Sequence, residues 1–192
     1  MTNPRTVAVV VGSLRKDSVN RKVAQALAAL TPDLSFSFVE IGDLPHFDQD
    51  LEAAPPAAWV RFREQIAAAD AALFVTPEYN RSVPGVLKNA IDVGSRPYGQ
   101  SVWNGKPGAV ISVSPGAVGG FGANHHLRQS LAFLNVATLQ QPEAYIGGAF
   151  SLFDEKGELV NAGTSDFLRA FGGAFSAWIA KILGDTAPAQ AA

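Results

Sequence analysis

Gly12-Ser13-Leu14-Arg15-Lys16-Asp17-Ser18-Val19-Asn20 is the stretch of sequence that decides the fold. It follows residues 6–11, an uninterrupted apolar and largely β-branched run with the length of one buried strand. It leads into residues 19–30, where apolar side chains recur at helical spacing. A strand, a turn rich in hydroxyl groups and a helix bring backbone N–H groups and the positive end of a helix dipole together. The stretch therefore predicts an anion site, with an ordinary turn capped by Ser18 as the alternative.

Four side chains in this stretch suit a phosphate. The hydroxyls of Ser13 and Ser18 and the amide of Asn20 are neutral donors, and the guanidinium of Arg15 is a charged one. Ser and Asn serve equally well as helix caps, however. The stretch alone therefore leaves the phosphate site and the capped turn open.

Length and composition limit the class of protein. The 192 residues are 47% hydrophobic and predict one α/β domain over 1–192, with 184–192 as a frayed tail. The net charge of −2 gives no indication of a basic surface for nucleic acid. No apolar run approaches the roughly 20 residues that span a bilayer. The absence of cysteine excludes disulfides and thiolate nucleophiles. With no signal peptide apparent, we expect a cytoplasmic protein.

Strands and helices alternate along the chain, which predicts a parallel sheet covered on both faces. The strands are expected at 6–11, 35–41, 71–76, 108–113 and 136–139, with 35–41 at an edge because polar and apolar residues alternate there. The helices are expected at 19–30, 57–69, 84–94, 124–134 and 164–183.

Five strands with this connectivity fit the doubly wound order 2-1-3-4-5. In that order the ligand site lies beyond the carboxyl ends of the strands, between strands 1 and 3. Three loops then meet, at 12–20, 77–84 and 114–122, and they are rich in Gly, Pro and hydrogen-bonding side chains. One shared ligand site explains them better than three unrelated loops.

Several common motifs are missing. Neither the G-x-G-x-x-G fingerprint nor a P-loop follows the first strand, and the chain has no nucleophile elbow with a late histidine. His125 and His126 have no carboxylate or cysteine companions at ligand spacing, so no metal is expected.

The second loop suits a flat heteroaromatic ring. Backbone N–H groups of the Pro77-Glu78-Tyr79-Asn80 segment suit ring nitrogens and carbonyls, and Tyr79 offers an aromatic surface. The alternative is a loop in which Tyr79 packs on a neighbour and Glu78 is a solvated charge. Three arginines are candidates to contact the phosphates of a nicotinamide cofactor, with surface charge as the alternative: Arg81, Arg96 and Arg128.

Together the three loops resemble the NADPH-dependent FMN reductase family, and most closely its flavodoxin-like quinone and chromate reductase branch. The resemblance runs from about residue 6 to 183. It rests on the first-turn stretch, on Pro77-Glu78-Tyr79-Asn80-Arg81-Ser82-Val83-Pro84-Gly85 with Leu87-Lys88-Asn89-Ala90-Ile91-Asp92, and on Ser114-Pro115-Gly116.

The resemblance implies a flavodoxin-like fold, bound FMN, and ping-pong transfer of two electrons from NADPH or NADH to quinones, free flavin or metal oxyanions such as chromate. No side chain is expected to be catalytic in itself. The implied residues are Ser13, Arg15, Ser18 and Asn20 for the FMN phosphate, Pro77, Glu78, Tyr79 and Asn80 for the isoalloxazine, and Ser114 and Gly116 for the other edge of the ring.

The resemblance also implies a homodimer or homotetramer with FMN near the interface, where Arg128 and Glu143 match interface positions. Arg81 departs from the pattern, because an aromatic residue is common there in this branch. The alternatives are a flavodoxin-like electron carrier and a redox-sensing FMN module, both without NAD(P)H turnover. Arg15 and the near-neutral charge argue against the carrier.

Overall fold

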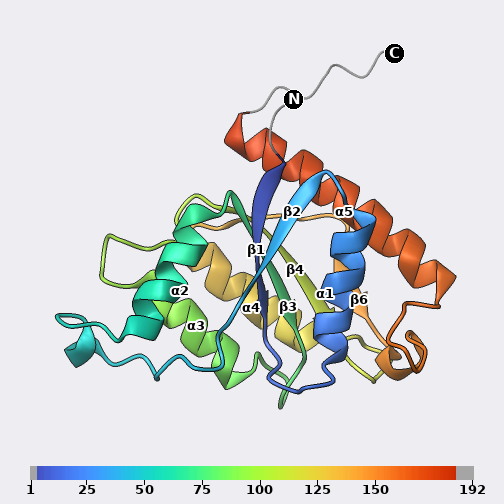
Figure 1. Cartoon of the computed structure of the whole chain (residues 1–192), viewed down its shortest axis with the longest axis horizontal. Coiled ribbons are helices and arrows are strands. Elements are labelled where there is room, and N and C mark those ends of the chain that lie inside the picture. The colour runs from blue at the N-terminus through green and yellow to red at the C-terminus, as the bar shows by residue number, and fades with distance from the viewer. Residues whose placement is uncertain (1–3, 185–192) are drawn as a thin grey trace.

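A parallel sheet runs through the protein between two layers of helices (Figure 1). The computed structural model describes residues 4–184. The strands are β1 (Arg5–Val11), β2 (Leu34–Val39), β3 (Ala71–Thr76), β4 (Pro107–Val113), β5 (Ala137–Thr138) and β6 (Ala144–Ile146). The helices are α1 (Val19–Leu30), α2 (Ala57–Ala68), α3 (Gly85–Ser95), α4 (Phe121–Phe133) and α5 (Ala162–Leu183), with short 3-10 turns η1 (Gln49–Leu51) and η2 (Ala149–Ser151). The order β2-β1-β3-β4-β5 confirms the prediction.

Each face of the sheet has its own core, because side chains alternate along every strand. Val7, Val9 and Val11 of β1 pack with α1 and α5. Ala8 and Val10 of the same strand face the opposite way and pack with α2, α3 and α4. Figure 1 shows this division, with α1 and α5 on one side of the sheet and the other three helices on the other. Burial on both faces explains why these strands are apolar throughout.

The edge beyond β4 differs from the expectation of five strands. The start of β4 pairs with β5, and its end pairs with a sixth strand, β6, through Ile111, Ser112 and Val113. The chain between β5 and β6 includes Pro142, which has no N–H to donate to a ladder. Two short strands therefore share the place of one, and β6 was not predicted.

Most predicted helix boundaries agree with the structure within two residues, and the start of α4 is the exception. This helix begins at Phe121, three residues before the predicted start. The predicted tail begins at Gly184, which ends α5 with a left-handed backbone; 185–192 lie outside the described residues. Within residues 4–184, no helix combines the length and hydropathy that crossing a bilayer requires.

Helix α5 approaches the end of α1 closely at one glycine. Gly172 is buried, and a Cβ placed on it would lie 3.2 Å from Cβ of Thr31, with the Thr31 hydroxyl closer still. Thr31 is itself 2% exposed at the C-cap of α1. The next residue, Gly173, has open space around the same position. The two neighbouring glycines therefore differ only in what surrounds them.

We expect Gly172→Ala to lower the free energy of unfolding by about 1–3 kcal/mol, because the added methyl group overpacks the contact between α1 and α5. Gly173→Ala is the matched control, and it should stabilise the protein by about 0.5–1 kcal/mol through helix propensity. Urea titration of both variants measures the difference. Equal effects would show that the close approach to Thr31 is unimportant.

Candidate functional site

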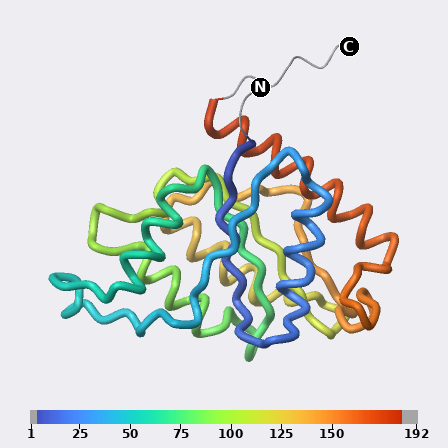
Figure 2. Tube along the Cα trace, viewed as in Figure 1, coloured from blue at the N-terminus to red at the C-terminus, as the bar shows by residue number. Residues whose placement is uncertain are grey.

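Four loops gather at the carboxyl edge of the sheet. They follow β1, β3, β4 and β6, and the tube in Figure 2 shows them side by side along the lower edge of the molecule. Three of them are the predicted loops, and the fourth contains η2. The structure therefore confirms that the three predicted loops meet, and adds a neighbour.

A cavity of about 180 Å³ lies between these loops. Its lining contains eight of the ten predicted site residues: Ser13, Arg15, Ser18, Asn20, Pro77, Glu78, Tyr79 and Ser114. Val19, Val113, Pro115 and Phe150 complete the lining. The other two predicted residues lie in the same loops but not on the cavity wall. Asn80 is exposed at the tip of its turn, and the N–H of Gly116 donates to Ser114 Oγ at 3.2 Å.

The first loop forms a polar pocket at the start of α1. Ser13, Ser18 and Asn20 are only 7%, 3% and 3% exposed, although all three side chains are polar. Asn20 Oδ1 is buried and has no hydrogen-bond partner within residues 4–184. The first N–H groups of α1 are also free of intrahelical partners, as at any helix start. A buried polar atom without a partner at a helix start is consistent with a pocket that a polar ligand completes.

Ser18 also caps α1, so the two predictions for this loop are compatible. Its Oγ accepts from the N–H of Arg21 at 3.3 Å, and its carbonyl accepts from Lys22 at 3.1 Å. The hydroxyl proton of a serine cap remains available to a second acceptor. The capped turn is therefore compatible with the predicted anion site.

The second loop forms the cavity wall next to β3. Tyr79 and Ser82 exchange two backbone hydrogen bonds of 3.0 Å across a two-residue turn. Tyr79 is 47% exposed, so part of its ring is free to contact a ligand. Glu78 is not the solvated charge of the alternative prediction. Its side chain is 13% exposed and contacts Arg81 at 3.2 Å and the N–H of Ala123 at 3.1 Å.

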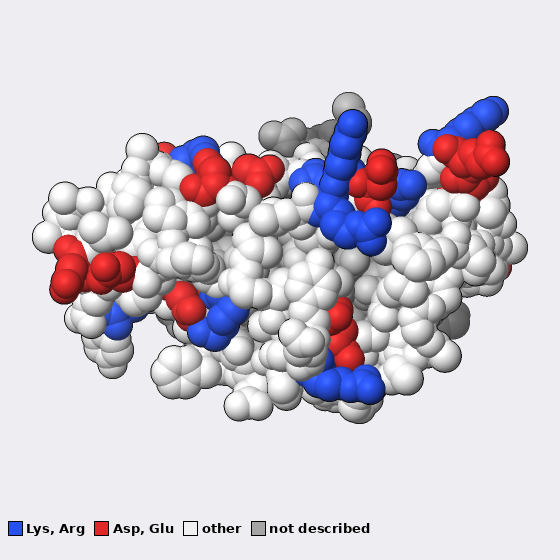
Figure 3. Space-filling view, turned by 90° about the horizontal axis from the view of Figure 1, so that it is seen from below, with Lys and Arg blue, Asp and Glu red and all other residues white. Residues whose placement is uncertain are grey.

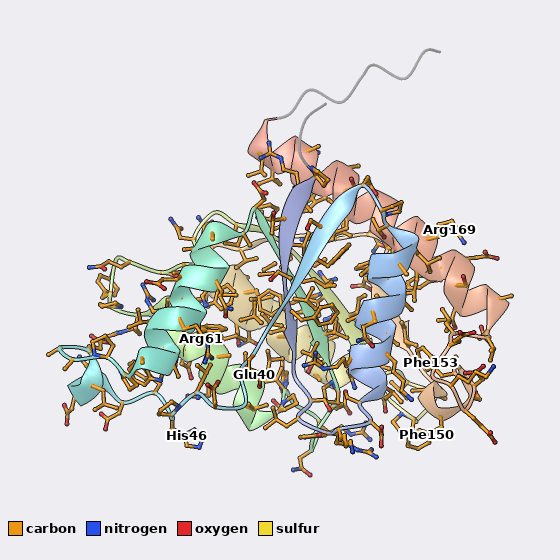
Figure 4. The ribbon with its side chains drawn as sticks, viewed as in Figure 1. Glu40, His46, Arg61, Phe150, Phe153 and Arg169 are labelled. Carbon is orange, nitrogen blue, oxygen red and sulfur yellow. The ribbon has the colours of Figure 1, made fainter. Side chains whose placement is uncertain are left out.

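Phe150 is a cavity residue that sequence reasoning missed. It belongs to η2, is 67% exposed, and lies at the lower edge of the molecule in Figure 4. The N–H of Ala149 donates to the carbonyl of Ser114 at 3.2 Å, which ties η2 to the third loop. The signal in the sequence was the Gly147-Gly148 pair after an apolar triplet, a pattern typical of a strand and its turn.

The edge of the molecule around the cavity carries few charges. Figure 3 looks onto this edge, where white residues cover most of the surface and Lys, Arg, Asp and Glu form small separate groups. Of the three candidate arginines, only Arg81 reaches the cavity wall, through Glu78. Arg96 pairs with Glu52 at 2.6 Å, and Arg128 donates to Asn124 and to the carbonyl of Leu139.

His125 and His126 make hydrogen bonds beside the site. His126 Nδ1 lies 3.0 Å from Ser82 Oγ, which links α4 to the second loop. His125 Nε2 lies 3.0 Å from the hydroxyl of Tyr145. Burial, together with a hydrogen bond to Glu143, raises the pKa of Tyr145 to about 12, so its hydroxyl keeps its proton at neutral pH.

The comparisons with known proteins agree on one family. A sequence profile described as NADPH-dependent FMN reductase matches residues 5–151. The chain belongs to this family. A quinone reductase of Pseudomonas putida is 66% identical to it over 181 residues, which cover 93% of this chain and 97% of that protein. The 2-hydroxy-1,4-benzoquinone reductase of a Burkholderia species is 52% identical over 174 residues, or 90% of this chain and 95% of that protein.

A solved structure agrees as well. That of FerB, a flavoenzyme NAD(P)H:(acceptor) oxidoreductase from Paracoccus denitrificans, matches this FMN reductase with a TM-score of 0.87 at 46% identity, and covers 92% of this chain and 98% of that one. The resemblance carried by the three loops is thus confirmed. This family member is an oxidoreductase with FMN as its cofactor and NAD(P)H as its electron donor. Its buried pocket, where the hydroxyls of Ser13 and Ser18 and the amide NH₂ of Asn20 are donors, fits a phosphate, and the second-loop wall with the half-exposed Tyr79 fits an aromatic ring.

Replacement of Ser18 tests its role in the helix. Ser18→Ala should lower the free energy of unfolding by about 1 kcal/mol, because the N–H of Arg21 loses its acceptor. Ser18→Asp should keep nearly full stability, since aspartate is as good a cap as serine. Thermal unfolding of the cofactor-free protein compares the two. A Ser18→Ala variant as stable as the parent would mean that water replaces the cap.

Proposed function

We propose that this FMN reductase is an FMN-dependent NAD(P)H:quinone oxidoreductase built as one domain. The observation that carries the proposal is the cavity at the β1–β3 switch point, which joins a buried polar pocket to a wall that contains a half-exposed tyrosine. The names of the Pseudomonas putida and Burkholderia relatives support a quinone as the acceptor. Quinones are planar and uncharged, and they suit the aromatic side chains of Tyr79 and Phe150 that line the cavity.

In this proposal each loop holds one part of the cofactor. Ser13, Ser18 and Asn20 donate hydrogen bonds to the phosphate, and the exposed Arg15 adds a charge-assisted contact. The second loop holds the isoalloxazine through Pro77–Asn80, and the Ser114–Gly116 segment borders its other edge. Phe150 extends this border, because it lines the same cavity.

The chain itself contributes positioning rather than a nucleophile or a base. Bound FMN supplies a carrier that takes a hydride from NAD(P)H and passes two electrons to the acceptor. Backbone N–H groups of the second loop orient the ring and stabilise the negative charge that reduction brings. Overall, NAD(P)H, a proton and a quinone become NAD(P)⁺ and a hydroquinone. The donor and the acceptor must bind at the same open wall, one after the other. The kinetic mechanism is therefore ping-pong.

Two further parts of the proposal concern acceptors and assembly. Free flavin and metal oxyanions such as chromate are additional acceptors, because an acceptor needs only to reach the open wall of the cavity. The chain forms a homodimer or homotetramer with the FMN site near the interface, and Arg128 and Glu143 lie in this contact. The exposed aromatic residues Tyr79, Phe121 and Phe150 near the site support a covered surface there.

The visible spectrum of the purified protein, followed by anaerobic titration with NADPH, tests the proposal. Flavin absorption should bleach on a catalytic timescale and return when a quinone is added. A flavin that binds but is not reduced by NADPH or NADH would favour the electron carrier. Protein that binds no added FMN would refute the proposal.

Arg15→Ala should weaken FMN binding roughly ten- to hundredfold, on the order of 1.5–3 kcal/mol, because a charge-assisted phosphate contact is lost. Ser18→Asp should weaken it as well, since it places a carboxylate against the phosphate while keeping the helix cap. Quenching of flavin fluorescence measures both affinities. Unchanged affinity in Arg15→Ala would return Arg15 to an ordinary surface charge.

Tyr79→Ala should change quinone kinetics or the flavin potential more than stability, because half of the ring is exposed at the cavity wall. Steady-state turnover with a quinone and thermal unfolding are measured on the same preparation. A large fall in melting temperature with unaltered turnover would instead make Tyr79 a structural residue.

A further inference from the structure

Glu78 is the one carboxylate among the residues that line the cavity, and both of its oxygens are engaged. Oε1 lies 3.2 Å from Nη1 of Arg81, and Oε2 accepts from the N–H of Ala123 at 3.1 Å. A Cβ on Gly122 would lie 2.9 Å from Oε2 and 3.0 Å from the carbonyl of Arg81. The first turn of α4 therefore leaves room for this carboxylate.

The carboxylate acts as the side-chain cap that α4 otherwise lacks. The N-cap residue, Gly120, offers no side chain, and the N–H of Ala123 in the first turn needs an acceptor. Glu78 supplies it from 45 residues away in sequence. The positive end of the α4 dipole and the Arg81 guanidinium together offset the negative charge of Glu78.

Arg81 keeps an unfavourable backbone conformation to make this contact. Asn80 and Arg81 have φ values of 52° and 66°, the left-handed pair of a tight hairpin turn. Glycine is strongly favoured at the second of these positions, because a side chain there is strained. The Arg81 side chain is 85% exposed, so burial does not hold it in place. A strained residue beside a functional site points to a role in that site.

We infer that Arg81 is the counter-ion of Glu78 in the flavin site, and that this ion pair sets the reduction potential of the bound FMN. The inference rests on the proposed function. Reduction adds negative charge to the flavin, so a carboxylate in the cavity wall that lacks its counter-ion opposes it. With Arg81 in place the pair is neutral, and the opposition is small.

The second loop does not depend on this ion pair for its position. Ser82 is held separately by His126 at 3.0 Å, and Tyr79 and Ser82 hold each other through two backbone hydrogen bonds. Removal of the Arg81 charge should therefore leave the turn in place. An electrostatic role and a structural role can then be distinguished by the sign of their effects.

The test is the midpoint potential of bound FMN in Arg81→Gln, Glu78→Gln and the double variant. Arg81→Gln leaves the first turn of α4 as the remaining compensation for the carboxylate, so the affinity for reduced relative to oxidised FMN should fall about three- to tenfold. For a two-electron couple this is a potential about 15–30 mV more negative. Glu78→Gln should shift the potential the opposite way, and the double variant should return near the parent.

Three controls make the result specific. Arg81→Lys should restore the parent potential, because it keeps the charge. Arg81→Gly should match Arg81→Gln, since it relieves the backbone strain but removes the cation. Lys88→Gln, which breaks the exposed ion pair between Lys88 and Asp92 on α3, should leave the potential unchanged.

Shifts of the same sign in Arg81→Gln and Glu78→Gln, or an Arg81→Gly variant with the parent potential, would overturn the inference. If Glu78→Gln does not fold, Arg81→Glu takes its place and should lower the potential further than Arg81→Gln. If the parent protein binds FMN and reduces quinones but the variants show no such shifts in potential, the ion-pair role alone is refuted. Parent protein that binds no FMN refutes the proposed function as well.

Discussion

The parallel pairing of β1 with β2 on one side and β3 on the other is the constraint on which the site depends. Because α1, which follows β1, covers one face of the sheet and α3, which follows β3, covers the other, the chain leaves β1 and β3 in opposite directions. The loops after these two strands therefore diverge and leave a gap at the carboxyl edge. The buried pocket of Ser13, Ser18 and Asn20 lies on one side of this gap, and the Glu78–Tyr79 wall lies on the other.

Features coded by neighbouring residues could be predicted from the sequence. The limits of α1 and β3 follow from the Ser18 cap and from an apolar run between polar turns, and the structure has both as expected. The strand order followed from connectivity, and the meeting of three loops followed from that order. These signals are local or depend on chain order alone, so no knowledge of distant contacts was needed.

Features coded by distant contacts could not be predicted. At the early start of α4, the N–H of Ala123 donates to Glu78, a residue 45 positions away in the sequence. Strand β6 has three residues, too few to show a strand period, and it is defined by its pairing with Ile111–Val113. Asn89 belongs to the motif that carried the family resemblance. Its side chain accepts from the N–H of Phe47 at 2.7 Å and donates to the carbonyls of Leu44 and Pro45, so it fastens the connection after β2. Its place in the motif gave no sign of that partner.

Because β5 and β6 share the edge of β4, the segment after β6 is joined to the sheet by a short strand. Phe150 lies on a segment that three residues of β6 join to the sheet, whereas the pocket of Ser13, Ser18 and Asn20 follows β1, which is paired along both sides. Exchange of residues 147–151 would change the width of the cavity without touching the central strands. The pocket at the start of α1 is thus the mechanically fixed half of the cavity, and the side that carries Phe150 is the half that loop exchange can change.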